Sequence, residues 1–155
     1  MEKPTIIGGK IIKDENRIIT GQIDPQYLSD NLGRKKGTAE AVVFPVSTEE
    51  ISGVMRYAWK NNLPVTPRGA GTNLVGSTVP SGHGIVLDVS LMNHVLELDE
   101  ETFMATVEPG VVLEDFQAYV ESKGLFYPPD PGEKKATIGG NISTNAGGMR
   151  AVNTV

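Results

Sequence analysis

Residues 67–77 read Pro-Arg-Gly-Ala-Gly-Thr-Asn-Leu-Val-Gly-Ser, with three glycines inside eight residues. Glycine has no Cβ, so such a loop can adopt positive φ angles and bring backbone N–H groups close to a ligand. Successive N–H groups in a turn of this kind form a concave cradle for anions such as phosphate. Arg68 adds a permanent positive charge, and Thr72 and Asn73 add short hydrogen-bonding side chains. The stretch predicts an anion-binding loop; the competing interpretation is a glycine-rich surface turn with an exposed arginine.

A second glycine-rich cluster, at residues 137–148, favours the first interpretation. It reads Thr-Ile-Gly-Gly-Asn-Ile-Ser-Thr-Asn-Ala-Gly-Gly and follows Tyr-Pro-Pro-Asp-Pro at 127–131, whose prolines fix the backbone φ angle. Small residues at this density allow two backbones, or a backbone and a flat ligand, to approach closely. The alternative is a flexible linker, but Ile138 and Ile142 are not typical of a Gly/Ser spacer.

The composition is that of a globular protein and excludes several kinds of site. The 155 residues are enough for one ordinary domain or two small lobes. Fourteen Lys and Arg against 19 Asp and Glu give a net charge of -5, which disfavours nucleic-acid binding. The chain has no cysteine, and His83 and His94 do not have the spacing of metal ligands. We therefore expect no metal site, and neither histidine has a partner at the spacing of a catalytic pair.

The N-terminal residues 1–37 predict a peripheral arm. Ile-Ile pairs at 6–7 and 11–12 flank Gly-Gly and suggest a short hairpin or docking arm, and Gly-Arg-Lys-Lys-Gly at 33–37 is typical of a surface linker. Met1 to Pro4 lack the apolar core of a secretion signal, and no apolar run is long enough to span a bilayer. A cytoplasmic location is the resulting expectation.

The first glycine loop follows a predicted strand–helix–strand unit. Residues 41–44 form an apolar run that predicts a buried strand, and 63–66 predict a second strand. Between them, Ser47 and Glu50 have the spacing of a capping box at the start of a helix. Its expected buried face is Ile51, Val54, Met55 and Ala58. The loop then lies at the carboxyl end of the second strand, where open α/β sheets bind ligands.

The second half of the chain predicts a third strand, a hairpin and a helix. Residues 84–89 form the strand, and 95–98 and 105–108 read as two antiparallel strands joined by an acidic turn. A helix then carries Leu113, Phe116, Tyr119 and Val120 on one face and ends before Gly124.

The glycine clusters and the segments between them resemble one family. Arg-Gly-Ala-Gly-Thr-Asn-Leu, Val-Glu-Pro-Gly, Tyr-Pro-Pro-Asp-Pro, Thr-Ile-Gly-Gly-Asn and Asn-Ala-Gly-Gly occur in that order, at 68–74, 107–110, 127–131, 137–141 and 145–148. The set is similar to the FAD-linked oxidases of the vanillyl-alcohol oxidase type, which have a PCMH-type FAD-binding domain. The glycolate oxidase large subunit and D-lactate dehydrogenase branch resembles it best, over residues 38–155.

The resemblance implies an α+β FAD-binding domain of two lobes with the cofactor between them. A small parallel βαβ lobe would occupy residues 38–78, and the start of an antiparallel-sheet lobe residues 79–155. FAD pyrophosphate would bind the first loop, at Arg68, Gly69, Ala70, Gly71, Thr72, Asn73 and Leu74. The flavin and ribityl side would contact Pro129, Asp130, Thr137, Gly139, Gly140, Asn141, Thr144, Asn145, Ala146 and Gly147. Relatives that attach flavin covalently have a histidine where this chain has Thr72, so non-covalent FAD is expected.

The family also implies that this chain is an N-terminal fragment. In relatives the FAD domain continues past the second Gly-Gly pair, and a substrate or cap domain follows with the Arg and His residues that bind and deprotonate a 2-hydroxy acid. We therefore expect no catalytic residues here, no activity of the fragment alone, and self-association through apolar surface.

Full-length relatives oxidise a 2-hydroxy acid to a 2-oxo acid and pass electrons to a quinone, an electron-transfer flavoprotein, an iron–sulfur subunit or oxygen. Two alternatives stay open: another flavoprotein of the same fold, such as the enolpyruvyl-sugar reductase, and a non-enzymatic nucleotide-binding module. The Tyr-Pro-Pro-Asp-Pro segment favours the 2-hydroxy-acid enzymes over the reductase.

Overall fold

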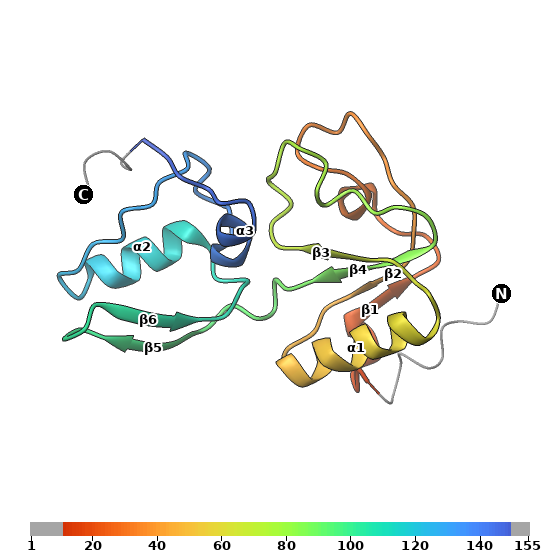
Figure 1. Ribbon diagram of the computed structural model, residues 1–155, viewed down its shortest axis with the longest axis horizontal. Coiled ribbons are helices and arrows are strands. Elements are labelled where there is room, and N and C mark those ends of the chain that lie inside the picture. Colours follow the sequence, from red (N-terminus) through yellow and green to blue (C-terminus); the bar gives the residue numbers. More distant parts are fainter. Residues whose placement is uncertain (1–10, 150–155) are drawn as a thin grey trace. The chain divides into compact units, whose positions relative to one another are not determined.

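The computed structural model describes residues 11–149 and forms two compact units, Met1–Leu91 and Met92–Val155. Each unit combines helices with a sheet of its own (Figure 1). The sheet of unit 1 contains parallel strand pairs, and that of unit 2 is antiparallel. This confirms the predicted mixed α and β fold class.

Unit 1 is a four-stranded sheet with strand order β1-β2-β4-β3. β4 pairs in parallel with both β2 and β3, and β1 adds an antiparallel edge. In chain order its elements are η1 Glu15–Arg17, β1 Ile18–Thr20, η2 Pro25–Leu28, β2 Ala39–Val43, α1 Thr48–Lys60, β3 Val65–Arg68 and β4 Gly84–Asp88.

Both faces of this sheet are covered, which explains the apolar runs at residues 41–43 of β2 and 85–87 of β4. One face packs against α1, as Figure 1 shows, through a core of Ile12, Ala41, Val43, Val54, Ala58, Ile85 and Leu87. The opposite face buries Val42 and Val86 with Ile23, and Tyr27, Leu28 and Phe44 pack against them.

Helix α1 begins where the capping motif predicts. The Ser47 hydroxyl accepts a hydrogen bond from the Glu50 N–H at 3.2 Å, but the Glu50 carboxylate accepts from the Val46 N–H at 2.9 Å instead of completing the capping box. Val54 is buried as expected, whereas Met55 is 46% exposed, so the prediction for Met55 was wrong. Packing against the sheet uses a narrower helix face than the apolar pattern indicates.

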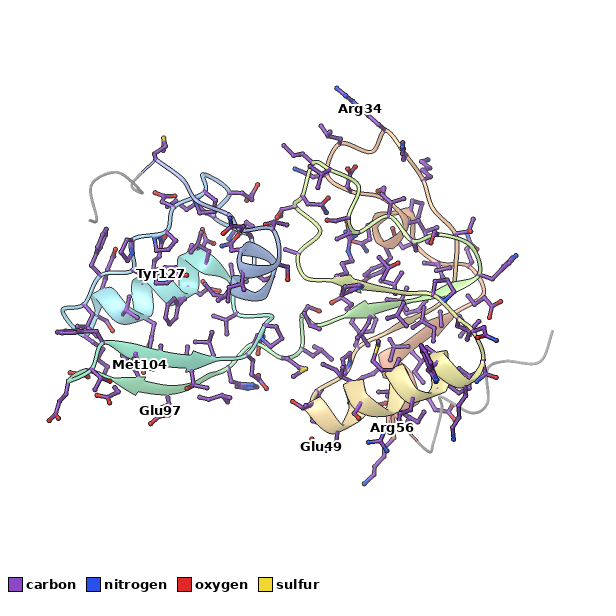
Figure 2. All side chains as sticks on the ribbon, viewed as in Figure 1. Arg34, Glu49, Arg56, Glu97, Met104 and Tyr127 are labelled. Atoms are coloured by element: carbon purple, nitrogen blue, oxygen red, sulfur yellow. The ribbon has the colours of Figure 1, made fainter. Side chains whose placement is uncertain are left out.

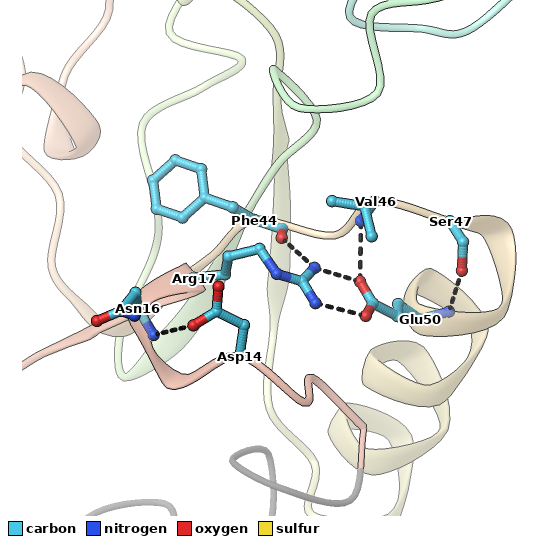
Figure 3. Close-up of polar contacts among 7 residues, drawn as sticks. All are labelled: Asp14, Asn16, Arg17, Phe44, Val46, Ser47 and Glu50. Carbon is cyan, nitrogen blue, oxygen red and sulfur yellow. Dashed lines mark hydrogen bonds and ion pairs between the residues drawn. The ribbon is translucent and has the colours of Figure 1, made fainter.

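Residues 11–37 are built into unit 1. β1 pairs with β2, and Ile12 is fully buried in the core beside α1. The Arg17 guanidinium donates to both Glu50 carboxylate oxygens, at 2.6 and 2.8 Å, and to the Phe44 carbonyl at 3.0 Å (Figure 3). This part of the predicted peripheral arm is therefore an edge strand with a fixed polar anchor; the Ile-Ile pair at 6–7 lies outside the described residues.

Strand β4 also belongs to unit 1, where it is the centre of the sheet. The predicted lobe boundary at residue 79 assigns this strand to the second lobe. The chain instead returns between β2 and β3, and the division falls after Leu91.

Unit 2 packs two helices on a hairpin. Its elements are β5 Val95–Asp99, β6 Met104–Val107, α2 Leu113–Glu121 and α3 Ile138–Ser143. The core consists of Val111, Leu113, Phe116, Val120 and Ile138, with Val95, Leu98, Val107, Leu125 and Tyr127 packed against it. The Tyr127 ring, labelled in Figure 2, meets Phe116 edge-on with 5.0 Å between ring centroids. Gly124 follows α2 with φ +74°, as predicted for a helix end.

An apolar cavity of about 360 Å³ opens in unit 2, lined by residues of the hairpin, α2, α3 and the segment after α2. Within residues 11–149, no helix combines the length and apolar character that a membrane crossing requires.

Candidate functional site

The first glycine loop lies at the carboxyl end of β3, as predicted. β3 ends at Arg68, which is in register with Asp88, the last residue of the neighbouring parallel strand β4. The loop therefore starts at the sheet edge where parallel strands present their carboxyl ends.

The loop backbone has the donor set of an anion site. The backbone N–H groups of residues 69–74 donate no hydrogen bond to any residue in 11–149. Gly71, in the middle, is buried and has φ +71°, a conformation that glycine adopts without strain. The backbone donors are thus available for a phosphate or pyrophosphate group, whose oxygens only accept hydrogen bonds.

Arg68 lies beneath this loop and is buried, with 8% of its surface exposed. Its Nη1 donates to the Ser29 carbonyl at 2.9 Å, and its guanidinium carbon lies 5.9 Å from the Tyr27 ring centroid. A Cβ on Gly71 would collide with the guanidinium. Arg68 therefore supports the loop and supplies positive charge from below, and the alternative of an exposed surface arginine is excluded.

Burial changes the electrostatics of this arginine. Desolvation lowers the pKa of Arg68 from its ordinary value, and the nearby negative charge of Asp88 opposes that shift. The Asp88 carboxylate is buried and accepts from the Ser90 N–H at 2.9 Å. An arginine keeps its charge in such surroundings, because its ordinary pKa lies far above neutrality.

Asn73 shapes the second half of the loop. Its side-chain oxygen accepts from the Val75 and Ser77 N–H groups at 3.3 and 3.1 Å, and its amide donates to the Thr78 hydroxyl at 2.7 Å. The side chain expected to bind a ligand is thus engaged inside the loop. Among the remaining predicted residues, Thr72 is half-buried, and Ala70 and Leu74 are exposed.

In unit 2 the second glycine cluster forms helix α3, which the sequence analysis did not predict. Thr137 caps it, with its hydroxyl accepting from the Gly140 N–H at 3.2 Å. Gly139 packs against the preceding turn, where a Cβ would lie 2.7 Å from the Cβ of Pro109. Gly139, the first residue of this Gly-Gly pair, is therefore required for the close packing of two backbone segments.

Asn141 on α3 carries an unsatisfied buried donor. The residue is 8% exposed, and its Nδ2 is the one buried side-chain nitrogen or oxygen in residues 11–149 without a hydrogen-bond partner. Leaving a buried amide unpaired is unfavourable by about 1–3 kcal/mol. An acceptor supplied by a ligand, such as a flavin carbonyl or a ribityl hydroxyl, would satisfy it.

Asp130 joins the proline-rich segment to the second Gly-Gly pair. Lys134 Nζ donates to its carboxylate at 2.8 Å and to Gln117 Oε1 at 3.3 Å. The Asp130 carbonyl accepts from the Met149 N–H at 3.3 Å, and a Cβ on Gly148 would collide with that carbonyl. Asp130 thus lies beside the second Gly-Gly pair, with its carboxylate neutralised by a lysine.

The other predicted residues of unit 2 extend this arrangement. Gln117 Nε2 donates to the Pro129 carbonyl at 3.1 Å. Thr144 donates to the Gly140 carbonyl at 3.0 Å, and the Ala146 N–H to the Asn141 carbonyl at 2.8 Å. Asn145 has a positive φ of 51° where the chain leaves α3, and Gly147 follows on the surface. The structure brings the predicted residues together as two groups, one in each unit.

Sequence reasoning missed two polar contacts. His94 Nδ1 lies 2.7 Å from Glu108 Oε2, and the same carboxylate accepts from the His94 N–H at 2.9 Å, which holds the pKa of Glu108 below its ordinary value. The antiparallel register places these residues together, so the hairpin prediction contained the signal. The second is the set of contacts between residues 29–31 and the first glycine loop.

Residues 11–149 contain no group of three metal-ligating side chains.

Comparison with known proteins agrees with this geometry. D-lactate dehydrogenase of Anaerostipes hadrus is 44% identical over 138 residues, covering 88% of this chain and 29% of the relative. Glycolate oxidase subunit GlcD of Bacillus subtilis is 47% identical over 127 residues, covering 81% of this chain and 27% of the relative. The structure of 6-hydroxy-D-nicotine oxidase from Arthrobacter nicotinovorans superposes with a TM-score of 0.66 at 25% identity, covering 77% of this chain and 26% of that one.

The chain therefore spans less than a third of the length of these curated relatives. The family model described as "FAD binding domain" matches residues 39–154, a range that includes both glycine clusters. This chain belongs to the FAD-binding domain family.

Proposed function

We propose that this chain is the FAD-binding part of a flavin-dependent dehydrogenase or oxidase that acts on a 2-hydroxy acid such as D-lactate or glycolate. The observation that carries the proposal is the run of unpaired N–H groups at 69–74, above a buried arginine, in a chain with a family match to FAD-binding domains. The names of the two curated relatives support the substrate class.

The residues of unit 1 are suited to the FAD pyrophosphate. The N–H groups of residues 69–74 would donate to its oxygens, and the Arg68 charge would stabilise them through the loop. Bound FAD would supply the redox chemistry by accepting a hydride equivalent from the substrate carbon. The chain's own contribution here is binding and electrostatics.

The residues of unit 2 are suited to the uncharged part of the cofactor. Asn141 offers a buried amide donor, and Gly139 and Gly140 leave the second and third positions of α3 without side chains. We assign Thr137, Asn141 and the 144–147 turn to the flavin and ribityl side. Asp130 would act by holding this turn, because its carboxylate is engaged by Lys134.

FAD is proposed to bind without a covalent bond. Thr72 occupies the loop position expected for an attachment histidine, and the described histidines, His83 and His94, lie in a surface turn and before β5. Flavin should therefore leave the protein on acid or urea denaturation. Flavin fluorescence that remains with the denatured polypeptide would contradict this assignment.

The direct test is an FAD titration followed by flavin fluorescence and equilibrium dialysis, on this chain and on the full-length gene product. Saturable FAD binding that ATP and NAD do not displace is the expected result. ATP or NAD binding that is stronger than FAD binding would instead support a nucleotide-binding module of another kind.

The substrate class needs a separate test. The full-length product should reduce an artificial electron acceptor in the presence of D-lactate or glycolate. FAD binding without turnover of any 2-hydroxy acid would leave the cofactor assignment standing and remove the substrate assignment. In that case the enolpyruvyl-sugar reductase activity would be the next one to assay.

A further inference from the structure

The stretch Ser29–Asn31 holds the first glycine loop at three points along its length. Each point is a hydrogen bond between residues about forty positions apart in the chain, at the start, middle and end of the loop. They are Arg68 Nη1 to the Ser29 carbonyl at 2.9 Å, the Asn31 N–H to the Asn73 carbonyl at 3.1 Å, and the Gly76 N–H to Asp30 Oδ2 at 3.0 Å.

Asp30 is the residue of this stretch whose side chain bonds to the loop. Its Oδ1 accepts from the Leu32 and Gly33 N–H groups at 3.1 and 3.0 Å, which fixes its own turn. Its Oδ2 reaches across to the Gly76 N–H. One half-buried carboxylate thus uses both oxygens to join two loops.

The glycine loop needs an anchor of this kind. Residues 69–83 contain no helix or strand, and their internal bonds shape only the turns around Asn73 and Gly76. Gly76 has φ +77°, so its N–H direction is set by a backbone conformation that few other residues adopt. Fixing such a loop before the ligand arrives lowers the entropy lost on binding.

We propose that Asp30 is a positioning residue of the FAD site: it holds the far end of the glycine loop, so that the N–H groups at 69–74 keep the arrangement that binds pyrophosphate. The inference rests on the proposed function and adds a residue from the segment predicted to be a peripheral arm. Because binding linkage is reciprocal, bound FAD stabilises the turn at 30–33 by the same coupling.

The test compares Asp30→Ala and Asp30→Asn with the control Asp24→Ala in the full-length gene product. Asp24 makes a similar turn, with its carboxylate accepting from the Gln26 N–H at 2.9 Å, and within residues 11–149 its hydrogen bonds stay in that turn. Asp30→Ala is expected to weaken FAD binding about tenfold or more, the effect of losing hydrogen bonds to a charged acceptor. Asp30→Asn keeps one acceptor oxygen, so its FAD affinity is expected to lie between those of the wild type and Asp30→Ala. Asp24→Ala is expected to bind FAD with the affinity of the wild type.

A second readout separates positioning from cofactor binding. Amide hydrogen exchange without FAD should show faster exchange at Gly76 in Asp30→Ala but not in Asp24→Ala. In the wild type, added FAD should slow exchange at Leu32 and Gly33, a measurement that needs no variant.

The outcomes are distinguishable. If the wild type binds FAD, then unchanged affinity in Asp30→Ala, or no FAD-dependent protection at 30–33, overturns the role of Asp30. If the wild type binds no FAD, the proposed function fails, and with it the role of Asp30 in binding; the Gly76 exchange rate then reports only whether the carboxylate anchors the loop.

Discussion

At the scale of single residues, the charged and glycine positions of the candidate site serve to build it. Arg68 is buried under the first glycine loop, and the Asp130 carboxylate is engaged by Lys134. Among the described residues, the groups without a protein partner include the backbone N–H groups at 69–74 and one buried side-chain amide, that of Asn141. Substitutions at the charged residues are therefore expected to act through the shape of the site and, at Arg68, also through the loss of its positive charge.

Gly71→Ala is expected to lower FAD affinity by more than tenfold and to destabilise the protein by about 1–2 kcal/mol, the penalty for a positive φ in a residue with a Cβ. The added methyl group would also displace the Arg68 guanidinium. Affinity is measured by flavin fluorescence and stability by urea unfolding.

The matched control for this substitution is Gly82→Ala. Gly82 has a similar φ of +67°, but no atom lies within 4 Å of the Cβ position. It should carry the same conformational penalty and leave FAD affinity unchanged. Equal losses of affinity in both variants would show that backbone strain alone, and not the loop–guanidinium contact, governs binding.

Lys134→Met tests the role assigned to Asp130. It removes the ammonium group from a carboxylate whose side chain is only 6% exposed. We expect the free energy of unfolding to fall by about 1–2 kcal/mol. This is below the range for fully buried ion pairs, because the lysine itself is 43% exposed. Amide exchange should become faster at Met149, whose N–H donates to the Asp130 carbonyl.

Lys135→Met provides the comparison, since Lys135 is the next residue and pairs with Glu114 on the surface. No change at Met149 is expected there. Faster exchange in both variants would point to a general effect of lost positive charge and would contradict a specific role for the Asp130–Lys134 pair.

At the scale of elements, the segment before β1 is joined to the start of α1 by one ion pair. The Arg17 hydrogen bonds hold the pKa of Glu50 below its ordinary value, with burial opposing that shift. Both side chains are 15% exposed, so solvent screening is limited. Arg17→Met is expected to destabilise the protein by about 1.5–3 kcal/mol at neutral pH, the range for hydrogen bonds to charged groups.

The difference in free energy of unfolding between the wild type and Arg17→Met should depend on pH with a definite sign. A carboxyl group with a depressed folded-state pKa contributes stability above its unfolded pKa, and this contribution is lost as the pH falls through its folded pKa. The gap between the wild type and Arg17→Met should therefore narrow in acid. Arg56→Met on the same helix removes only a hydrogen bond to Ser52, and its smaller effect should not depend on pH in this way. A difference in free energy of unfolding that stays constant as the pH falls would exclude the ion pair with Glu50 as the source of the stabilisation by Arg17.

Elements with a clear period and cap were predictable from the sequence. The apolar runs of β2 and β4, the Ser47 cap of α1 and the hairpin β5–β6 all lie where their patterns indicate. Helix α3 was missed because Gly-Gly pairs disfavour a helix interior. Its formation depends on the Thr137 cap and on the contact of Gly139 with Pro109, which is a tertiary effect.

The candidate site was predictable only in part, for the same reason. The local composition of the glycine clusters was enough to predict them as candidate binding segments. The contacts of Asp30 with Gly76 and of Arg17 with Glu50 join residues 46 and 33 positions apart, and no local pattern encodes such pairs. The side-chain roles of Asn73 and Asp130 likewise became clear only when their partners could be named.

At the scale of the whole molecule, each unit has its own hydrophobic core. The clusters of unit 1 draw on residues between Ile11 and Leu87, and that of unit 2 on residues between Val95 and Ile138. Each unit also contains one of the two glycine clusters.

Unfolding without FAD is accordingly expected to show two transitions, one for each unit, because separate cores need not unfold as one two-state system. Ile85→Ala and Leu113→Ala remove fully buried side chains from unit 1 and unit 2, respectively. Each substitution should lower the free energy of unfolding of its own unit by about 2–5 kcal/mol and leave that of the other unit unchanged. Calorimetry, with amide exchange to assign each transition, makes the measurement. A single transition that both variants lower equally would show that the two cores unfold together.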